Sequence, residues 1–175
     1  FEYWAYSFIF IKDKVSPKDI PFKLNRAQRR VLNKLEKLRK AGKPIKFILL
    51  KARQWGGSTL VQIYMLWIML VHRRNWNTVI CGDVETQSRN VRAMITKALN
   101  KYPSYLLGET VKFTPFEGSS KNKVIQNTNC VVSIGSFQKP DTLRSGDISG
   151  AHLTEIGLWR ATPGKKPEDL IQSIS

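Results

Sequence analysis

The chain is poor in cysteine and in acidic residues. Its two cysteines, Cys81 and Cys130, lie in runs of apolar or small residues. A disulfide-stabilised scaffold needs more cysteines than this, so we expect a reducing, intracellular setting. Asp and Glu number 13 against 29 Lys and Arg, which gives a formal net charge of +16. This excess favours a polyanionic partner, with nucleic acid ahead of a membrane, unless a larger protein carries the balancing acids elsewhere.

The sequence also lacks a long hydrophobic run. Its longest apolar stretch, residues 60–71, is interrupted only by Gln62 and falls far short of the roughly 20 residues that span a bilayer. Residues 1–11 have no basic region and no small-residue cleavage site, which argues against a signal peptide. Internal repeats and low-complexity segments are absent as well. We therefore expect a buried helix at 60–71 and no membrane partner.

The length of 175 residues suits one ordinary domain. Aromatic-rich residues 1–11 and polar residues 12–20 predict an N-terminal extension and connector over residues 1–20, followed by a globular domain over residues 21–175. The chain starts at Phe1, and its last expected helix starts at Pro167, close to the final residue. We expect both ends to be cut from a longer protein.

Helix and strand signals alternate along the globular part. Asn25 and Gln28 have the spacing of a capping box, and apolar residues follow at helical spacing. Further helices are expected over 58–71, over 85–101 and from Pro167. The expected strands cover 45–50, 78–81, 111–113, 124–126, 131–137 and 151–154, with a tight turn at 127–129. This alternation predicts a three-layer α/β domain with a mainly parallel central sheet and a small β insertion before Gly135.

A glycine-containing loop, residues 51–57, joins the expected strand 45–50 to the helix that starts at Ser58. In such a connection the backbone N–H groups and the positive end of the helix point toward one place, which is how phosphates are held. A hydroxyl at the helix start is suited to ligate Mg²⁺, and basic side chains in the loop can neutralise phosphate charge.

The loop departs from the strict P-loop pattern at two positions. Ala52 stands where the first glycine is expected, and Gly57 stands where the lysine is expected. The residues alone therefore leave a plain strand–turn–helix connection as an alternative.

Three segments resemble the large terminase subunits of tailed bacteriophages, and they occur in the order of the ATPase half of that DNA-packaging motor. Residues 53–59, Arg-Gln-Trp-Gly-Gly-Ser-Thr, resemble its variant P-loop. Residues 22–28, Phe-Lys-Leu-Asn-Arg-Ala-Gln, resemble its adenine-recognition segment, and residues 143–159 resemble the strand that ends in its catalytic glutamate. The resemblance implies a P-loop NTPase fold that hydrolyses ATP with Mg²⁺ to move double-stranded DNA into a procapsid.

The resemblance also implies roles for individual residues. Glu155 becomes the carboxylate that orients or deprotonates the attacking water, and Arg53 becomes a catalytic cation at the γ-phosphate. Lys51 is the second candidate for the cation that replaces the missing lysine, and this choice stays open. Ser58 is implied as a Mg²⁺ ligand, with Thr154 acting through a bound water. The full set of implied ATP contacts is Gln28, Lys51, Arg53, Gln54, Gly56, Gly57, Ser58 and Thr59.

Gln28 has two interpretations. The residues alone favour its role in the capping box, whereas the resemblance implies that its amide contacts the edge of adenine. One rotamer cannot serve both roles.

The resemblance implies partners beyond the nucleotide: double-stranded DNA, a portal protein, a small terminase subunit and further copies of the chain in a ring on the portal. The implied location is the host cytoplasm, at the procapsid portal. A nuclease domain follows the ATPase domain in this family and would lie after Ser175.

Two other interpretations stay open. A helicase-like P-loop translocase would share Gln28, the loop and Glu155. A basic nucleic-acid-binding module with a degenerate nucleotide site would explain Gly57, and also Thr154, which stands where many P-loop enzymes carry an aspartate.

Overall fold

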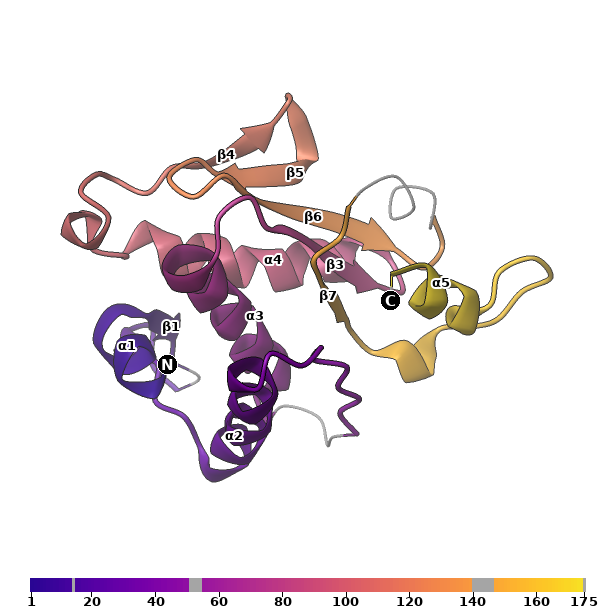
Figure 1. Ribbon diagram of the computed structural model, residues 1–175, viewed down its shortest axis with the longest axis horizontal. Coiled ribbons are helices and arrows are strands. Elements are labelled where there is room, and N and C mark those ends of the chain that lie inside the picture. Colours follow the sequence, from indigo (N-terminus) through magenta and orange to yellow (C-terminus); the bar gives the residue numbers. More distant parts are fainter. Residues whose placement is uncertain (14, 51–54, 140–146, 175) are drawn as a thin grey trace.

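A five-stranded sheet forms the centre of the computed structural model, which describes residues 1–13, 15–50, 55–139 and 147–174 (Figure 1). The strand order is β4-β5-β6-β3-β7. β3 pairs in parallel with both β6 and β7, whereas β5 runs antiparallel to its neighbours β4 and β6. The strands are β3 (Asn77–Gly82), β4 (Phe113–Phe116), β5 (Ser119–Ile125), β6 (Cys130–Ser136) and β7 (Gly150–Leu153). The α/β class and the mainly parallel sheet are confirmed, and the β4–β5 hairpin is the expected insertion.

Both faces of the sheet are covered by other parts of the chain. Because side chains alternate along each strand, neighbouring residues of β3 pack on opposite faces. On β3, Ile80 packs with the helices α3 (Gly57–Trp67) and α4 (Glu85–Asn100). Val79 and Cys81 instead pack with Trp159 and with Leu170 of α5 (Pro167–Ile174) on the opposite face. The result is three layers, the third one thin. Short helical segments complete the chain: η1 (Ile68–His72), η2 (Ser104–Leu106) and η4 (Ile156–Leu158).

Helix α2 (Arg26–Lys40) packs beside α3 and begins at the expected capping box. The Asn25 side chain accepts from the Gln28 backbone N–H, and the Gln28 side chain accepts from the Asn25 N–H, each at 2.9 Å. On the α3 side, Tyr64 Oη donates to Glu36 Oε1 at 2.7 Å. Val31, Leu32 and Leu35 bury the inner face of α2 in the main core.

The first residues of the chain fold against the same core. Helix α1 (Glu2–Phe8) contributes Ala5, and strands β1 (Phe10–Lys12) and β2 (Asp19–Pro21) form a small antiparallel hairpin. Ala5 and Ile9 are completely buried in the main core. The division into an extension over 1–20 and a domain over 21–175 stays a prediction, although this packing ties the two parts together.

The prediction of a strand over residues 45–50 is wrong. Residues 43–50 have no regular secondary structure, and the side chains of Ile48 and Leu50 are 95% and 100% exposed. A strand needs a hydrogen-bonded neighbour. Within the described residues, β7 at the end of the sheet pairs with β3 alone, so the run 45–50 has no partner strand there.

None of the helices within the described residues is long and apolar enough to cross a membrane.

Candidate functional site

Helix α3 begins at a glycine turn. Gly56 is its N-cap residue, with φ 83° and ψ 26°, and Gly57 is the first helical residue. The left-handed conformation at position 56 favours glycine, because a Cβ is strained there. Within the described part of the chain, no side chain caps this helix start. The amide groups of its first turn are thus suited to an anion, and Ser58 and Thr59 lie in that turn, half-buried.

Gln28 connects this turn to helix α2. It is 4% exposed, and its Nε2 donates to the Gly56 carbonyl oxygen at 3.0 Å. Asn25 adds a second link, with Nδ2 donating to the Trp55 carbonyl oxygen at 3.1 Å. The structure therefore places Gln28 in its capping role, with its amide already bonded on both sides. The adenine contact stays a prediction and requires another rotamer.

Three of the implied ATP contacts, Lys51, Arg53 and Gln54, lie outside the described residues. Trp55, next along the chain, is partly buried and packs against the main core.

Glu155 follows strand β7 with an unusual backbone. Its φ of 57° and ψ of 38° are left-handed, and it serves as the N-cap of η4. A non-glycine residue in this region carries about 1–3 kcal/mol of strain, and such strain is concentrated at functional sites. The carboxylate oxygen Oε2 accepts a hydrogen bond from Gln87 Nε2 at 3.2 Å. Thr154 before it is buried, and its backbone N–H donates to the Cys81 carbonyl oxygen at 2.8 Å.

A buried polar contact joins helix α3 to strand β7. Gln62 Nε2 lies 2.6 Å from His152 Nδ1, and the Gln62 side chain is almost fully buried. This contact fixes the helix that carries Ser58 against the strand that leads to Glu155. His152 and Gln62 therefore have a structural role, and the sequence gives no signal of their contact.

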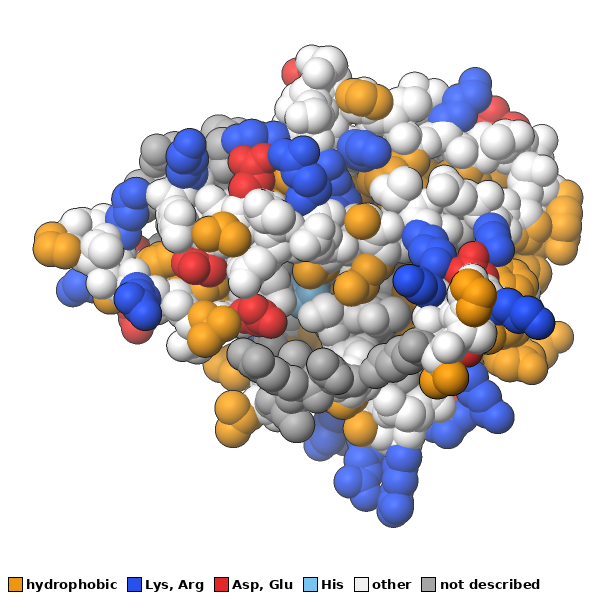
Figure 2. Space-filling model, turned by 180° about the vertical axis from the view of Figure 1, so that it is seen from behind, with side chains coloured by type: hydrophobic (Ala, Val, Ile, Leu, Met, Phe, Trp, Pro, Cys, Tyr) orange, Lys and Arg blue, Asp and Glu red, His pale blue; other side chains and the backbone are white. Residues whose placement is uncertain are grey.

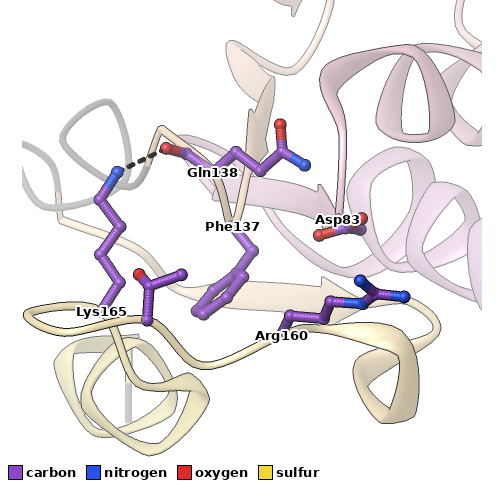
Figure 3. A pocket seen from close by; sticks show the side chains of 6 residues that line it. Asp83, Phe137, Gln138, Arg160 and Lys165 are labelled. Carbon is purple, nitrogen blue, oxygen red and sulfur yellow. Dashed lines mark hydrogen bonds between the residues drawn. The ribbon is translucent and has the colours of Figure 1, made fainter.

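A pocket of about 270 Å³ opens beyond the carboxyl ends of β3 and β6. Figure 3 shows Arg160 extending toward the side of the pocket that holds Asp83, with the Phe137 ring between Arg160 and Lys165. Lys165 Nζ donates to the Gln138 carbonyl oxygen at 2.8 Å. The Phe137 ring stacks on Trp159, with the ring centroids 4.9 Å apart. This is the edge at which open α/β sheets present their ligand-facing groups.

The two cysteines of the chain lie in strands of the central sheet, Cys81 near the carboxyl end of β3 and Cys130 at the start of β6. Cys81 and Cys130 are free and buried, as the sequence predicts for a chain without disulfides. Burial in the apolar core, with a smaller contribution from the Asp83 charge, raises the pKa of the Cys81 thiol to about 12. Among the described residues, no cluster of three or more His, Cys, Asp or Glu could hold a metal ion. A Mg²⁺ ion held by one hydroxyl and substrate phosphates needs no such cluster.

The predicted residues thus form two groups in the described structure. Gln28, Gly56 and Gly57 lie together with Ser58 and Thr59 at the start of α3. Thr154 and Glu155 lie at the end of β7, and the Gln62–His152 contact connects the two elements. Gln87 at the second group was missed, because its sequence position carries no signal of its contacts with Glu155 and with the Asp83 backbone.

Comparison with known proteins gives a likeness in structure but none in sequence. No family model and no curated protein sequence matches the chain. The fold is similar to that in the crystal structure of the HK97 bacteriophage large terminase, with a TM-score of 0.69 and 18% sequence identity. The similarity covers 98% of this chain and 34% of that chain, so the chain spans about a third of the terminase's length. The likeness confirms the resemblance to a large terminase at the level of the fold, whereas the role of the loop in phosphate binding stays a prediction.

Proposed function

We propose that the chain forms the ATPase part of a viral DNA-packaging motor, which hydrolyses ATP to move double-stranded DNA into a procapsid. One observation carries the proposal, and it is made in a terminase-like fold. Helix α3 starts without a side-chain cap after the left-handed Gly56, and a buried contact connects this helix to β7, the strand that leads to the strained Glu155. The first feature suits a phosphate chain, and backbone strain like that of the second is concentrated at functional sites.

The residues at the start of α3 fit a nucleotide with its metal ion. The first-turn amides would hold phosphate oxygens, and the Ser58 hydroxyl would ligate Mg²⁺, with Thr154 acting through a bound water. Mg²⁺ supplies neutralisation of the charge that develops on the phosphates. Glu155 would orient the attacking water and accept its proton. Arg53, or Lys51 in its place, would bring the remaining positive charge.

A basic surface on α2 supports the DNA part of the proposal. The exposed Lys and Arg residues of this helix are Arg26, Arg29, Arg30, Lys34, Lys37 and Lys40. Of these, Arg29 forms an ion pair with Glu2, and Glu36, the only acid of the helix, is turned toward Arg39 and Tyr64. Figure 2 shows Lys and Arg side chains projecting from the lowest part of the molecule, which is the part that Figure 1 assigns to α2 and the loop before it. Such a surface suits a duplex phosphate backbone.

We further propose that the chain works at the procapsid portal in the host cytoplasm, in a ring of identical subunits. Its partners there would be the portal protein and the small terminase subunit, as the likeness to a large terminase suggests.

Calorimetric titration with ATP, with and without Mg²⁺, tests the nucleotide site. We expect the parent protein to bind Mg·ATP, and Ser58→Ala to weaken binding more with Mg²⁺ than without it. Ser104→Ala, an exposed serine of η2, is the matched control and should leave both affinities unchanged. Equal losses under the two conditions would contradict the ligand role of Ser58. No nucleotide binding by the parent protein would overturn the proposed function.

A further inference from the structure

We propose that Gln87 is a positioning residue for the Glu155 carboxylate, an inference that rests on the proposed function. Gln87 lies in the first turn of α4, directly after strand β3. Its side chain connects the ends of two neighbouring parallel strands, since Cys81 of β3 pairs with Leu153 of β7.

The two ends of the Gln87 amide make different hydrogen bonds. Oε1 accepts from the Asp83 backbone N–H at 3.0 Å, and Nε2 donates to Glu155 Oε2 at 3.2 Å. A backbone N–H is only a donor, so it must face the amide oxygen. The Asp83 contact therefore fixes which end of the amide points at Glu155, and that end is the donor that a carboxylate requires.

Packing at the end of β3 holds this arrangement in place. A Cβ built at Gly82 would lie 3.0 Å from both Cβ and Oε1 of Gln87, so the side chain fills the space that glycine leaves. The neighbouring Ser88 is completely buried. Its Oγ accepts from the Gly82 N–H at 2.8 Å and donates to the Gly135 carbonyl oxygen at 2.6 Å. The first turn of α4 is thus anchored to β3 and β6, and Gln87 is anchored with it.

The carboxylate needs such a partner because it stands at the protein surface. Glu155 is exposed, and its own rotamers are not fixed by burial. The strained backbone sets the direction in which the side chain leaves the chain, and the Gln87 bond sets the orientation of its end. The bond engages Oε2, so Oε1 can point toward the attacking water. A misplacement of about 1 Å at such a group costs on the order of 10²-fold in rate.

Steady-state ATP hydrolysis by the intact protein, in the presence of duplex DNA, tests the role. Gln87→Ala should lower kcat by roughly 10–100-fold while KM and the nucleotide Kd stay within about threefold. Gln87→Glu keeps the acceptor for the Asp83 N–H but cannot donate to Glu155, so its kcat should fall at least as far. Gln126→Ala is the matched control: Gln126 is an exposed glutamine whose Nε2 donates to Thr114 Oγ1, and its loss should leave kcat unchanged.

A second readout does not depend on turnover. In ¹⁵N spectra, the Gln87 side-chain amide signal, assigned by its loss in Gln87→Ala, should move in Glu155→Ala and stay in place in Glu117→Ala. Glu117 is an exposed turn residue between β4 and β5. If the parent hydrolyses ATP and Gln87→Ala keeps the parental kcat, the positioning role is overturned and the proposed function stands. If the Gln87 amide signal does not move in Glu155→Ala, the proposed contact between Gln87 and Glu155 is overturned. If the parent neither binds nor hydrolyses ATP, both proposals fall.

Discussion

Gln28 and Gly56 lie against each other, with Gln28 Nε2 donating to the Gly56 carbonyl oxygen at 3.0 Å. The same glutamine accepts from the Asn25 N–H, so one side chain joins the first turn of α2 to the turn that begins α3. The candidate phosphate-binding turn is thus held by a residue of a different helix, and its shape depends on the cap of that helix.

Replacing Gly56 by alanine tests how tightly this turn is packed. A Cβ at this position would lie 2.8 Å from Gln28 Nε2, and φ is +83°, so Ala meets both a clash and backbone strain. We expect the free energy of unfolding to fall by about 2–3 kcal/mol and Mg·ATP affinity to fall with it. Gly108→Ala is the control, because Gly108 has a φ of +75° and a Cβ at that position would have nothing within 4 Å of it. Equal effects of the two changes on stability would contradict the packing argument.

Gln28→Ala should destabilise helix α2. The change removes the acceptor of the Asn25 N–H and the link to Gly56, and we expect a loss of about 1 kcal/mol in the free energy of unfolding, measured with urea. Asn25→Asp separates the capping role of Asn25 from its link to the turn before α3. The aspartate keeps the acceptor for the Gln28 N–H but loses the donor to the Trp55 carbonyl oxygen. It should retain parental stability to within about 0.5 kcal/mol. An unchanged urea midpoint in Gln28→Ala would show that the capping box does not stabilise the chain.

The contact between α2 and α3 should depend on pH. Arg39 donates to both carboxylate oxygens of Glu36, at 2.7 and 2.9 Å, and Tyr64 donates a third bond. The Arg39 guanidinium, with help from Tyr64, holds the pKa of Glu36 below its ordinary value. Because the folded-state pKa is lowered, this stabilisation is complete above the ordinary pKa of 4.5 and is lost as the pH falls through the folded-state value.

Glu36→Gln checks this expectation. At pH 7 the variant should be less stable than the parent by about 1–2 kcal/mol, because a charge-assisted pair is replaced. Below the pKa of Glu36 the difference should shrink, since the parent carboxyl is then neutral as well. Urea unfolding at pH 7 and pH 3 measures both values. A difference that is the same at the two pH values would contradict the role of the Glu36 charge.

Duplex DNA should bind through the basic surface on α2. The variant Arg26→Gln, Arg30→Gln, Lys37→Gln should weaken DNA binding at low salt, with little dependence on DNA sequence. The slope of log K against log salt should fall by about 1 for each phosphate that the variant no longer neutralises. The variant Arg74→Gln, Lys112→Gln, Lys166→Gln removes the same net charge from exposed positions elsewhere. If both variants lose the same affinity, net charge and not this surface carries the binding.

Local patterns in the sequence were sufficient to predict the helices, strands and turns that depend on residues close together in the chain. The capping box at Asn25 and Gln28, the turn at 127–129, the mostly buried strands β3 and β6 and the partly exposed strand β7 follow from caps, turn residues and apolar runs. The run 45–50 shows the limit of such reasoning. Its composition indicates a strand, but a strand also needs a neighbour, and composition cannot supply one.

The candidate site was predictable only in part. Glycines and hydroxyls of the loop are contiguous in the sequence, so their pattern could be read. The Gln87–Glu155 and Gln62–His152 contacts join residues 68 and 90 positions apart, and they arise from the order of strands in the sheet. Likewise, the left-handed backbone of Glu155 reflects how the chain leaves β7, for which the residue type gives no signal.

Glu155→Gln in the intact protein tests whether Glu155 acts on the water that attacks ATP. The substitution keeps the size of the side chain and removes its ability to accept a proton. ATP affinity by calorimetry and DNA-stimulated phosphate release should be measured on the same preparation, with Arg53→Ala alongside to report loss of charge stabilisation by about 10³-fold or more. We predict ATP affinity within a few-fold of the parent and no DNA-stimulated hydrolysis. Hydrolysis by Glu155→Gln at the parental rate would contradict the assignment of the catalytic strand.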